Sequence, residues 1–413
     1  MEFRQTQLAN GLTIITEITP TAASMASGFF VRTGSRDETP EVAGVSHFLE
    51  HMVFKGTTRR SPADVNREFD EMGANYNAFT SEENTVYYGA VLAEYQDRLL
   101  DLLGDILRPS LRQEDFDVEK NVILEEIAMY DDMPRYRLYD NLMTQHFAPH
   151  PLAHSVLGTR QSVRDLNRQQ MQAYFDRRYS PANVTVVGVG NLDFDRFVAK
   201  VSSMCSHWKP YEVSRDLPEA APTGKSGLIS DKKVTRQHIG IMSPAPTGQD
   251  DDRFAAMLVS TIIGDSTGSR LFYALVDPAL ADEASMGYDP LDGAGVFITF
   301  LSCDPEIASK VLKITRDEIR KFRDEGPTAG EIIAAKNKIA SSATLKGELP
   351  MGRLTAVGFD WVYRRQYVPL KDQIDKLYAV TTDEVMSIAR RYDLTRQTIL
   401  GLGPAETLEA MES

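Results

Sequence analysis

The chain has 413 residues, 42% of them hydrophobic and 25% charged, so it is long and apolar enough to form more than one domain with a core. Its formal net charge of −14 argues against nucleic acid as a partner, and the acidity indicates either attraction for basic peptides or only solubility. Because no run approaches the roughly 20 apolar residues of a membrane helix, the first residues lack a secretory pattern, and the only cysteines are Cys205 and Cys303, we expect a cytoplasmic protein that is not attached to a membrane.

A short histidine- and glutamate-containing run near the N-terminus carries the first chemical signal. His47-Phe48-Leu49-Glu50-His51 reads H-x-x-E-H, the inverted form of the zinc-protease motif. On a helix, His47, Glu50 and His51 share one face, because residues three and four apart are neighbours. The two imidazoles could then bind one zinc ion, with Glu50 over the open coordination position. The alternative is an ordinary pair of surface or core histidines, and five letters alone do not exclude it.

The flanking residues predict the helix that this geometry requires. Thr39 is a candidate N-cap, Pro40 fits the first helical position, and Gly56 is expected to end the helix. The apolar residues expected to bury one side of it are Val45, Phe48, Leu49, Met52 and Val53.

A β-hairpin is predicted next along the chain. Residues 75–80 alternate in character, residues 85–88 are rich in β-forming side chains, and Ser81 to Asn84 between them are turn-forming. From these residues alone, the hairpin could simply belong to the core.

Two glutamates in the segment 119–126 are candidates for a third metal ligand. Glu119 and Glu126 lie seven residues apart, which is about two helical turns, so they share a stripe that Val122 and Ile123 would pull inward. Glu125 is rotated by about 100° from Glu126 and is expected to face solvent. The alternative for the whole segment is a solvated acidic face.

The organisation of the chain is expected to be a duplication. A stretch rich in proline and charge near residues 209–227 separates halves of similar length, and each half ends in a β-rich run, 184–190 and 398–403. We therefore predict an α+β fold with two similar domains, each a mainly antiparallel sheet covered by helices. The expected boundaries are residues 1–212 for the metal-binding domain, 213–227 for the linker and 228–413 for a similar domain without metal.

These motifs, in this order, resemble the pitrilysin-type zinc peptidases, and more narrowly the mitochondrial-processing-peptidase branch and its short bacterial relatives. The resemblance implies one zinc ion per chain, bound by His47, His51 and Glu126. It implies that Glu50 is the general base and that Glu119 supports the metal or proton transfer. It also implies that the strand containing Asn77, Ala78 and Phe79 takes up the substrate backbone by strand addition, and that two chains form a four-domain chamber.

One departure from the family concerns the second half. Many relatives carry an arginine and a tyrosine after a Ser-Arg-Leu-Phe run. The run is present here as residues 269–272, but Ala279 and Glu283 occupy the aligned positions. Tyr288 and Arg353 are possible substitutes. The partner chain is therefore expected to be either a second copy or a related chain that bears the missing pair.

The function that we predict is a zinc-dependent endopeptidase that cleaves unfolded or short extended peptides. Glu50 would take a proton from the attacking water and pass it to the leaving amine. Two alternatives remain: a metal-containing peptide-binding or chaperone-like protein, and a non-catalytic structural subunit of a larger complex.

Overall fold

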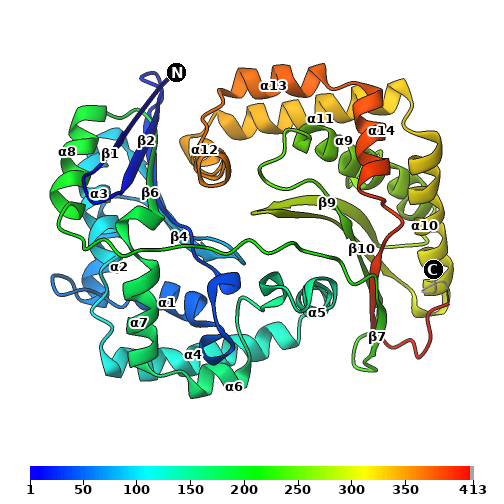
Figure 1. Ribbon diagram of the computed structural model, residues 1–413, viewed down its shortest axis with the longest axis horizontal. Coiled ribbons are helices and arrows are strands. Elements are labelled where there is room, and N and C mark those ends of the chain that lie inside the picture. Colours follow the sequence, from blue (N-terminus) through cyan, green and yellow to red (C-terminus); the bar gives the residue numbers. More distant parts are fainter. Residues whose placement is uncertain (410–413) are drawn as a thin grey trace. The chain divides into compact units, whose positions relative to one another are not determined.

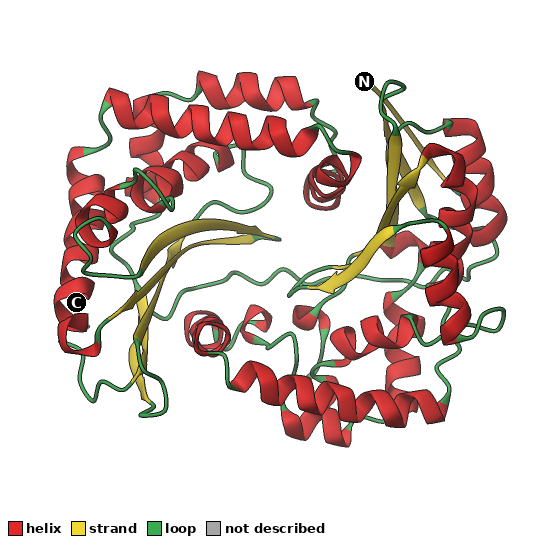
Figure 2. Ribbon diagram, turned by 180° about the vertical axis from the view of Figure 1, so that it is seen from behind, coloured by secondary structure: helices red, strands yellow, loops and turns green. Residues whose placement is uncertain are grey.

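The computed structural model describes residues 1–409 and contains two β-sheets, each covered by helices (Figure 2). The predicted α+β class with two similar domains is confirmed. Two sets of segments form two units, each with its own sheet. Unit 1 comprises Met1–Ile127, His154–Asp216 and Thr344–Val368, and unit 2 comprises Ala128–Ala153, Leu217–Ala343 and the chain from Pro369 onward.

The sheet of unit 1 has the strand order β1-β2-β6-β3-β5-β4, in which β2 and β6 are parallel and the other neighbours antiparallel. The β-branched run that forms β6 is buried along its whole length, which suits a central strand. The hairpin predicted from turn chemistry is confirmed as β4 and β5, and β4 lies at the edge of the sheet. The strands are β1 (Glu2–Gln7), β2 (Thr13–Ile18), β3 (Ser24–Val31), β4 (Asn75–Thr80), β5 (Thr85–Leu92) and β6 (Val184–Gly190).

The sheet of unit 2 repeats this arrangement in the order β7-β11-β8-β10-β9. Its last strand, β11, is parallel to β7 and antiparallel to β8, as β6 is parallel to β2 and antiparallel to β3. The same pairing pattern in both halves is the structural form of the duplication. The strands are β7 (Ser226–Ser230), β8 (Gln237–Pro244), β9 (Glu283–Leu291), β10 (Ala294–Cys303) and β11 (Thr398–Gly403).

Helices fill the connections between the strands. Within residues 1–409, none of them combines the length and the apolarity needed to cross a bilayer. Those of the first 205 residues are η1 (Ser35–Asp37), η2 (Pro40–Val42), α1 (Val45–Val53), α2 (Pro62–Glu71), η3 (Ala93–Tyr95), α3 (Gln96–Ile106), α4 (Gln113–Asp131), α5 (Pro134–Phe147), η4 (Pro151–Ala153), α6 (Arg160–Asp165), α7 (Arg168–Arg178), η5 (Pro181–Asn183) and α8 (Phe194–Cys205). Those that follow are α9 (Arg253–Gly264), η6 (Phe272–Val276), η7 (Pro305–Ile307), α10 (Ala308–Glu325), α11 (Ala329–Gly347), α12 (Pro350–Arg364), α13 (Leu370–Ala379) and α14 (Thr382–Arg391).

Each unit includes a helix from the other half of the sequence (Figure 1). Helix α12 packs on β3 and β6 of unit 1, where Leu354 and Val357 join a buried cluster with Phe30 and Val187. Helix α5 packs in the same way on β8 and β11 of unit 2. The predicted boundaries at 212 and 228 divide the chain into two continuous halves and did not foresee this exchange of helices. They remain a prediction about the halves of the sequence. Residues 209–225, which include most of the predicted linker, form neither helix nor strand.

Candidate metal centre

Helices α1 and α4 bring three candidate ligands together in unit 1. One potential ligand atom from each of His47, His51 and Glu126 lies within 4.8 Å of the others. The Nε2 atoms of His47 and His51 lie 3.8 and 3.5 Å from Oε2 of Glu126. The two elements are far apart in sequence, so the convergence depends on how α1 packs against α4.

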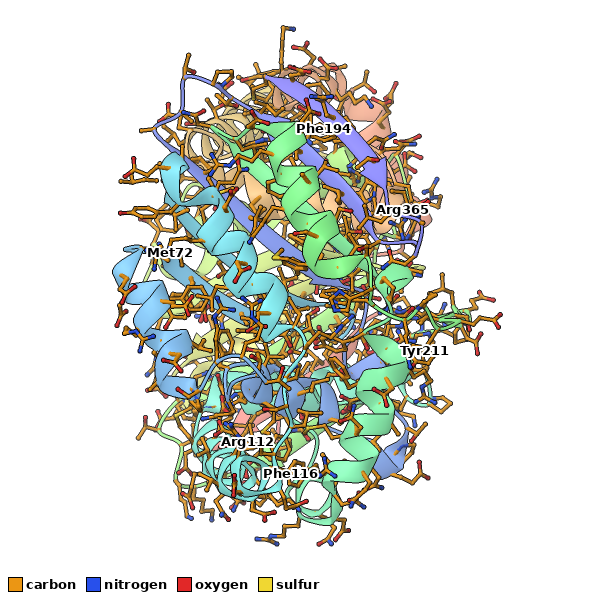
Figure 3. All side chains as sticks on the ribbon, turned by 90° about the vertical axis from the view of Figure 1, so that its left-hand side faces the viewer. Met72, Arg112, Phe116, Phe194, Tyr211 and Arg365 are labelled. Carbon is orange, nitrogen blue, oxygen red and sulfur yellow. The ribbon has the colours of Figure 1, made fainter. Side chains whose placement is uncertain are left out.

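Two contacts, one within α1 and one just after it, fix that packing. The Phe48 ring of α1 stacks on the Phe116 ring of α4, with centroids 4.7 Å apart. Arg112, which is labelled beside Phe116 in Figure 3, donates a hydrogen bond of 2.7 Å to the backbone oxygen of Lys55. The apolar positions predicted to bury α1 are all buried.

The start of α1 differs from the prediction. Pro40 begins the separate 3-10 turn η2, Thr39 makes no side-chain cap bond there, and α1 starts at Val45 after Gly44, which has a φ of 90°. The carboxylate of Glu38 accepts the amides of Gly44 and Ser46 at 2.6 and 2.7 Å. A buried side chain from before the turn therefore takes up orphan amide groups that a local cap would otherwise satisfy.

On α4, the stripe of Glu119, Ile123 and Glu126 faces inward as predicted, and Glu125 is exposed. The prediction for Val122 was wrong. This residue is 45% exposed, because it lies on the solvent-facing side of α4. Ile123 and Ile127 supply the burial instead.

Glu119 is not one of the three converging side chains; it contacts the outer ring nitrogen of His51 instead. Its Oε1 lies 2.9 Å from Nδ1 of His51, and its Oε2 lies 2.6 Å from Nζ of Lys55. An acceptor on Nδ1 fixes the ring tautomer and leaves the lone pair of Nε2 directed toward Glu126. Although burial opposes it, the bonds to His51 and Lys55 hold the pKa of Glu119 below its usual value.

The electrostatics of the cluster favour a bound cation. Burial, helped by the nearby His51, lowers the pKa of His47 to about 3, so this imidazole is neutral. Burial raises the pKa of Glu126, with a further contribution from Glu119. A neutral imidazole is the form that binds metal, and a carboxylate in such surroundings gains from a positive charge.

The donor set fits zinc. The His–Glu separations exceed the roughly 2.7–3.2 Å of an ordinary N–H···O hydrogen bond, and within residues 1–409 Oε2 of Glu126 is buried without a hydrogen-bond partner. The three side chains therefore do not satisfy one another. Two imidazole nitrogens and one carboxylate oxygen are a usual set for a catalytic zinc site, which keeps a fourth position open.

Glu50 lies on the same face of α1 and is half-buried. Its Oε2 accepts a hydrogen bond of 2.6 Å from the hydroxyl of Thr80, the last residue of β4. Burial raises the pKa of Glu50, the Thr80 bond opposes that rise, and the negative charge of Glu126 adds to it.

The candidate substrate-binding residues lie on the edge strand. Asn77 is exposed, Ala78 is buried and Phe79 is half-buried on β4, which has a neighbour, β5, on one side only. The backbone amide of Ala78 donates to the side-chain oxygen of its own neighbour, Asn77, at 2.9 Å. This amide is therefore turned away from β5, toward the free edge.

Two suggested substitutes for the missing arginine and tyrosine are engaged elsewhere. In unit 1, the Arg353 guanidinium pairs with Glu17 at 2.5–2.8 Å, and both side chains are buried. In unit 2, the Tyr288 hydroxyl donates to the backbone oxygen of Pro246 at 2.9 Å. At the two aligned positions, Ala279 has a φ of 56° and Glu283 pairs with Arg135 of α5.

Sequence reasoning missed three residues that the structure places around the site: Glu38, Lys55 and Thr80. Lys55 could have been noticed, because it is four residues after His51 and therefore near it on a helix. Glu38 and Thr80 had no such signal, since their contacts depend on a turn and on the docking of a strand against a helix.

Comparison with protein families gives matches over most of the chain. Residues 13–160 match the model described as insulinase (peptidase family M16), and residues 165–339 match the model described as the peptidase M16 inactive domain. An uncharacterized zinc protease of Mycobacterium tuberculosis is 32% identical over 97% of this chain and 93% of its own length. One from Streptomyces coelicolor is 30% identical over 98% of this chain and 91% of its own length.

Solved structures agree on the fold. The crystal structure of a protease from Helicobacter pylori superposes with a TM-score of 0.91 at 19% identity, covering 98% of this chain and 99% of that one. A structure described as the peptidase M16 inactive domain from Pseudomonas fluorescens gives a TM-score of 0.89 at 19% identity and covers 99% of both chains.

Proposed function

We infer the function from one premise: this chain belongs to the insulinase family of peptidases, family M16. We propose that it is a zinc-dependent endopeptidase. The observation that carries this proposal is the convergence of His47, His51 and Glu126, with Glu50 on the same helical face as the two histidines. Membership of family M16 rests on the family matches and on relatives that are named zinc proteases.

His47, His51 and Glu126 would hold one zinc ion per chain. When bound, zinc supplies a Lewis acid that polarises a peptide carbonyl and makes a water molecule acidic near neutral pH. Glu119 holds His51 through Nδ1, and Lys55 holds Glu119, so that the ring keeps the tautomer with its Nε2 lone pair free.

Glu50 supplies the proton transfer. Its carboxylate accepts a proton from the attacking water and then delivers it to the nitrogen of the leaving amine, which is a general base acting next as a general acid. Burial raises the pKa of Glu50, which favours both halves of this exchange near neutral pH.

The substrate would be an unfolded or short extended peptide that adds as a further strand to the free edge of β4, along Asn77, Ala78 and Phe79. Main-chain hydrogen bonds supply affinity in this mode, and side-chain pockets supply selectivity. The edge amide of Ala78 is available once the peptide displaces the Asn77 side chain.

We also propose that the chain belongs to the short bacterial type near the mitochondrial-processing-peptidase branch and works as a dimer that forms a chamber. Because Ala279 and Glu283 replace the arginine and tyrosine, and Arg353 and Tyr288 are engaged in internal contacts, a related partner chain is favoured over a second copy. Turnover of the purified chain, measured alone and then with any related chain that copurifies with it, tests this. High turnover alone, unchanged by the relative, would contradict it.

The decisive experiment pairs zinc content with turnover on a quenched fluorogenic peptide. Wild-type protein should contain about one zinc ion per chain and, assayed together with any related chain that copurifies with it, should cleave the peptide. Glu50→Gln should keep zinc but lose roughly 10²–10⁴-fold in kcat under the same conditions. Glu125→Gln, at an exposed glutamate next to Glu126, is the matched control and should behave as wild type. Wild-type zinc binding without turnover, whether the chain is assayed alone or with a copurifying relative, would favour the peptide-binding alternative. Absence of both zinc and turnover would favour the structural-subunit alternative.

A further inference from the structure

We propose that Thr80 is a positioning residue for Glu50, and that it couples the docking of peptide on β4 to the orientation of the base. This inference rests on the proposed function, because it assigns Glu50 the role of base and β4 the role of substrate-binding strand. It adds a residue to which no sequence motif pointed.

The side chain of Thr80 holds one oxygen of Glu50. Its hydroxyl lies 2.6 Å from Oε2 of Glu50 and 3.5 Å from the Thr85 hydroxyl. The Thr85 hydroxyl donates its own proton to the backbone oxygen of Thr33 at 3.0 Å. Because the ionised Glu50 carboxylate can only accept and lies much nearer than the Thr85 hydroxyl, the proton of Thr80 goes to Oε2 of Glu50. This leaves Oε1 as the oxygen that accepts the proton from water.

The backbone of the same residue faces the free edge of the sheet. The amide of Ser81 donates to the backbone oxygen of Asn84, so these two residues form the bonded pair that closes the hairpin. In an antiparallel ladder bonded and non-bonded pairs alternate, so the next pair, Thr80 opposite Thr85, is non-bonded. The N–H and C=O groups of Thr80 therefore point away from β5, as the amide of Ala78 does.

The hairpin turn that follows Thr80 is held firmly within unit 1. Glu83 and Arg36 form an ion pair in which each side chain is 1% exposed, and the Arg36 amide donates to the backbone oxygen of Glu82 at 2.9 Å. Tyr363 of α12 donates to Oε2 of Glu83 at 2.8 Å and accepts from Asn84 at 3.0 Å. These contacts fix the end of β4, and with it the position of the Thr80 hydroxyl.

Thr80 thus serves two partners at once. A peptide that extends the sheet along β4 would bond to its backbone, while its side chain keeps the base aligned. Because a small misplacement of a reacting group can lower the rate strongly, removal of this hydroxyl should lower kcat rather than weaken peptide binding.

The test compares Thr80→Val, which keeps the branched shape but has no hydroxyl, with Thr80→Ser, which keeps the hydroxyl. Thr13→Val is the matched control, because Thr13 is a half-buried threonine on β2, with three strands between it and β4. For each zinc-loaded protein, kcat and KM on a quenched fluorogenic peptide, zinc content and the urea midpoint are measured. Affinity for a fluorescein-labelled copy of the peptide is measured by anisotropy in the Glu50→Gln background.

We expect Thr80→Val to lower kcat by about 10–100-fold, the effect typical of losing a group that supports a site residue, with KM, zinc content and peptide affinity unchanged. Thr80→Ser should recover most of kcat, and Thr13→Val should match wild type. Wild-type kcat in Thr80→Val, or a lower kcat accompanied by loss of zinc or of cooperative unfolding, would overturn the inference while leaving the proposed function intact. Absence of zinc-dependent turnover in the wild-type chain, both alone and with any related chain that copurifies with it, would overturn both.

Discussion

At the residue scale, the adjacent glutamates Glu125 and Glu126 of α4 have different surroundings. Glu126 turns its Oε2 toward both imidazoles, whereas Glu125 is exposed. The difference follows from the rotation of about 100° between successive helical residues. Identical side chains one position apart therefore differ in whether they face the proposed zinc site.

This predicts that Glu126→Ala lowers zinc content well below one ion per chain, because the ion loses one of three protein ligands. Glu125→Ala should retain zinc as wild type does. Elemental analysis of zinc-replete, desalted samples provides the measurement, and equal zinc content in the two variants would remove Glu126 from the ligand set.

A second residue-scale prediction concerns the support of His51. Glu119→Gln should weaken zinc affinity by roughly 10–100-fold, as loss of an outer hydrogen-bond partner commonly does, because the amide is a poorer acceptor for Nδ1–H of His51 and a poorer partner for Lys55. Competition with a fluorescent chelator measures this affinity. Zinc affinity equal to wild type would mean that His51 needs no such support.

At the element scale, α1 depends on a cap that comes from outside the helix. Glu38 is 5% exposed and binds the amides of Gly44 and Ser46, even though burial raises its pKa to about 8. Removal of the Glu38 side chain should therefore destabilise the nine-residue helix α1, which carries both histidines.

We predict that Glu38→Ala lowers the free energy of unfolding by roughly 1–3 kcal/mol, the cost of leaving a buried donor unpaired, and reduces zinc retention. Glu41→Ala is the control, because Glu41 is exposed in η2 and is expected to change stability by less than about 0.5 kcal/mol. Urea unfolding measures both. Equal stability of the two variants would show that the Glu38 bonds are dispensable.

Helix α5 provides an element-scale prediction for pH. His146 of α5 is 1% exposed and its Nδ1 lies 2.9 Å from the Thr398 hydroxyl of β11. Burial, helped by the charge of Arg396, lowers its pKa from 6.5 to about 4. Between these values the unfolded chain binds a proton that the folded chain does not, so stability falls as pH falls from about 6.5 to about 4.

The loss attributable to this residue is on the order of 3 kcal/mol. In His146→Gln the same fall in pH should reduce stability by correspondingly less, whereas His207→Gln, at an exposed histidine, should keep the wild-type dependence. Urea unfolding at a series of pH values distinguishes them, and parallel curves for all three proteins would contradict the assignment.

At the scale of the whole molecule, neither unit is built from one continuous half of the chain. Helix α12 reaches unit 1 from residues beyond 344 and is fixed there by the ion pair of Arg353 with Glu17, to which the Tyr367 hydroxyl also donates at 2.8 Å. Unit 1 therefore depends on residues more than a hundred positions after the rest of its sequence.

We predict that Arg353→Met lowers the free energy of unfolding by about 3–5 kcal/mol, because it leaves the Glu17 carboxylate buried without its counter-charge. The double variant Glu17→Met/Arg353→Met should recover most of that loss, since a matched apolar pair removes the uncompensated charge. Urea unfolding of the two variants is the measurement. A double variant as unstable as the single one would indicate that packing, not charge, anchors α12.

Features that depend on local periodicity could be predicted from the order of residues alone. The spacing of His47, Glu50 and His51, the inward stripe of Glu119 and Glu126 and the hairpin at 75–88 follow from the fixed geometry of helices and strands, in which near neighbours have one possible arrangement. Other features became visible only in the folded chain: Glu38 caps α1, Thr80 binds Glu50, and each unit takes up a helix, α5 or α12, from the other half of the sequence. The internal contacts of Arg353 and Tyr288 belong to the same group. These contacts join elements far apart along the chain, and their geometry is set by how whole surfaces pack, which no spacing between residues encodes.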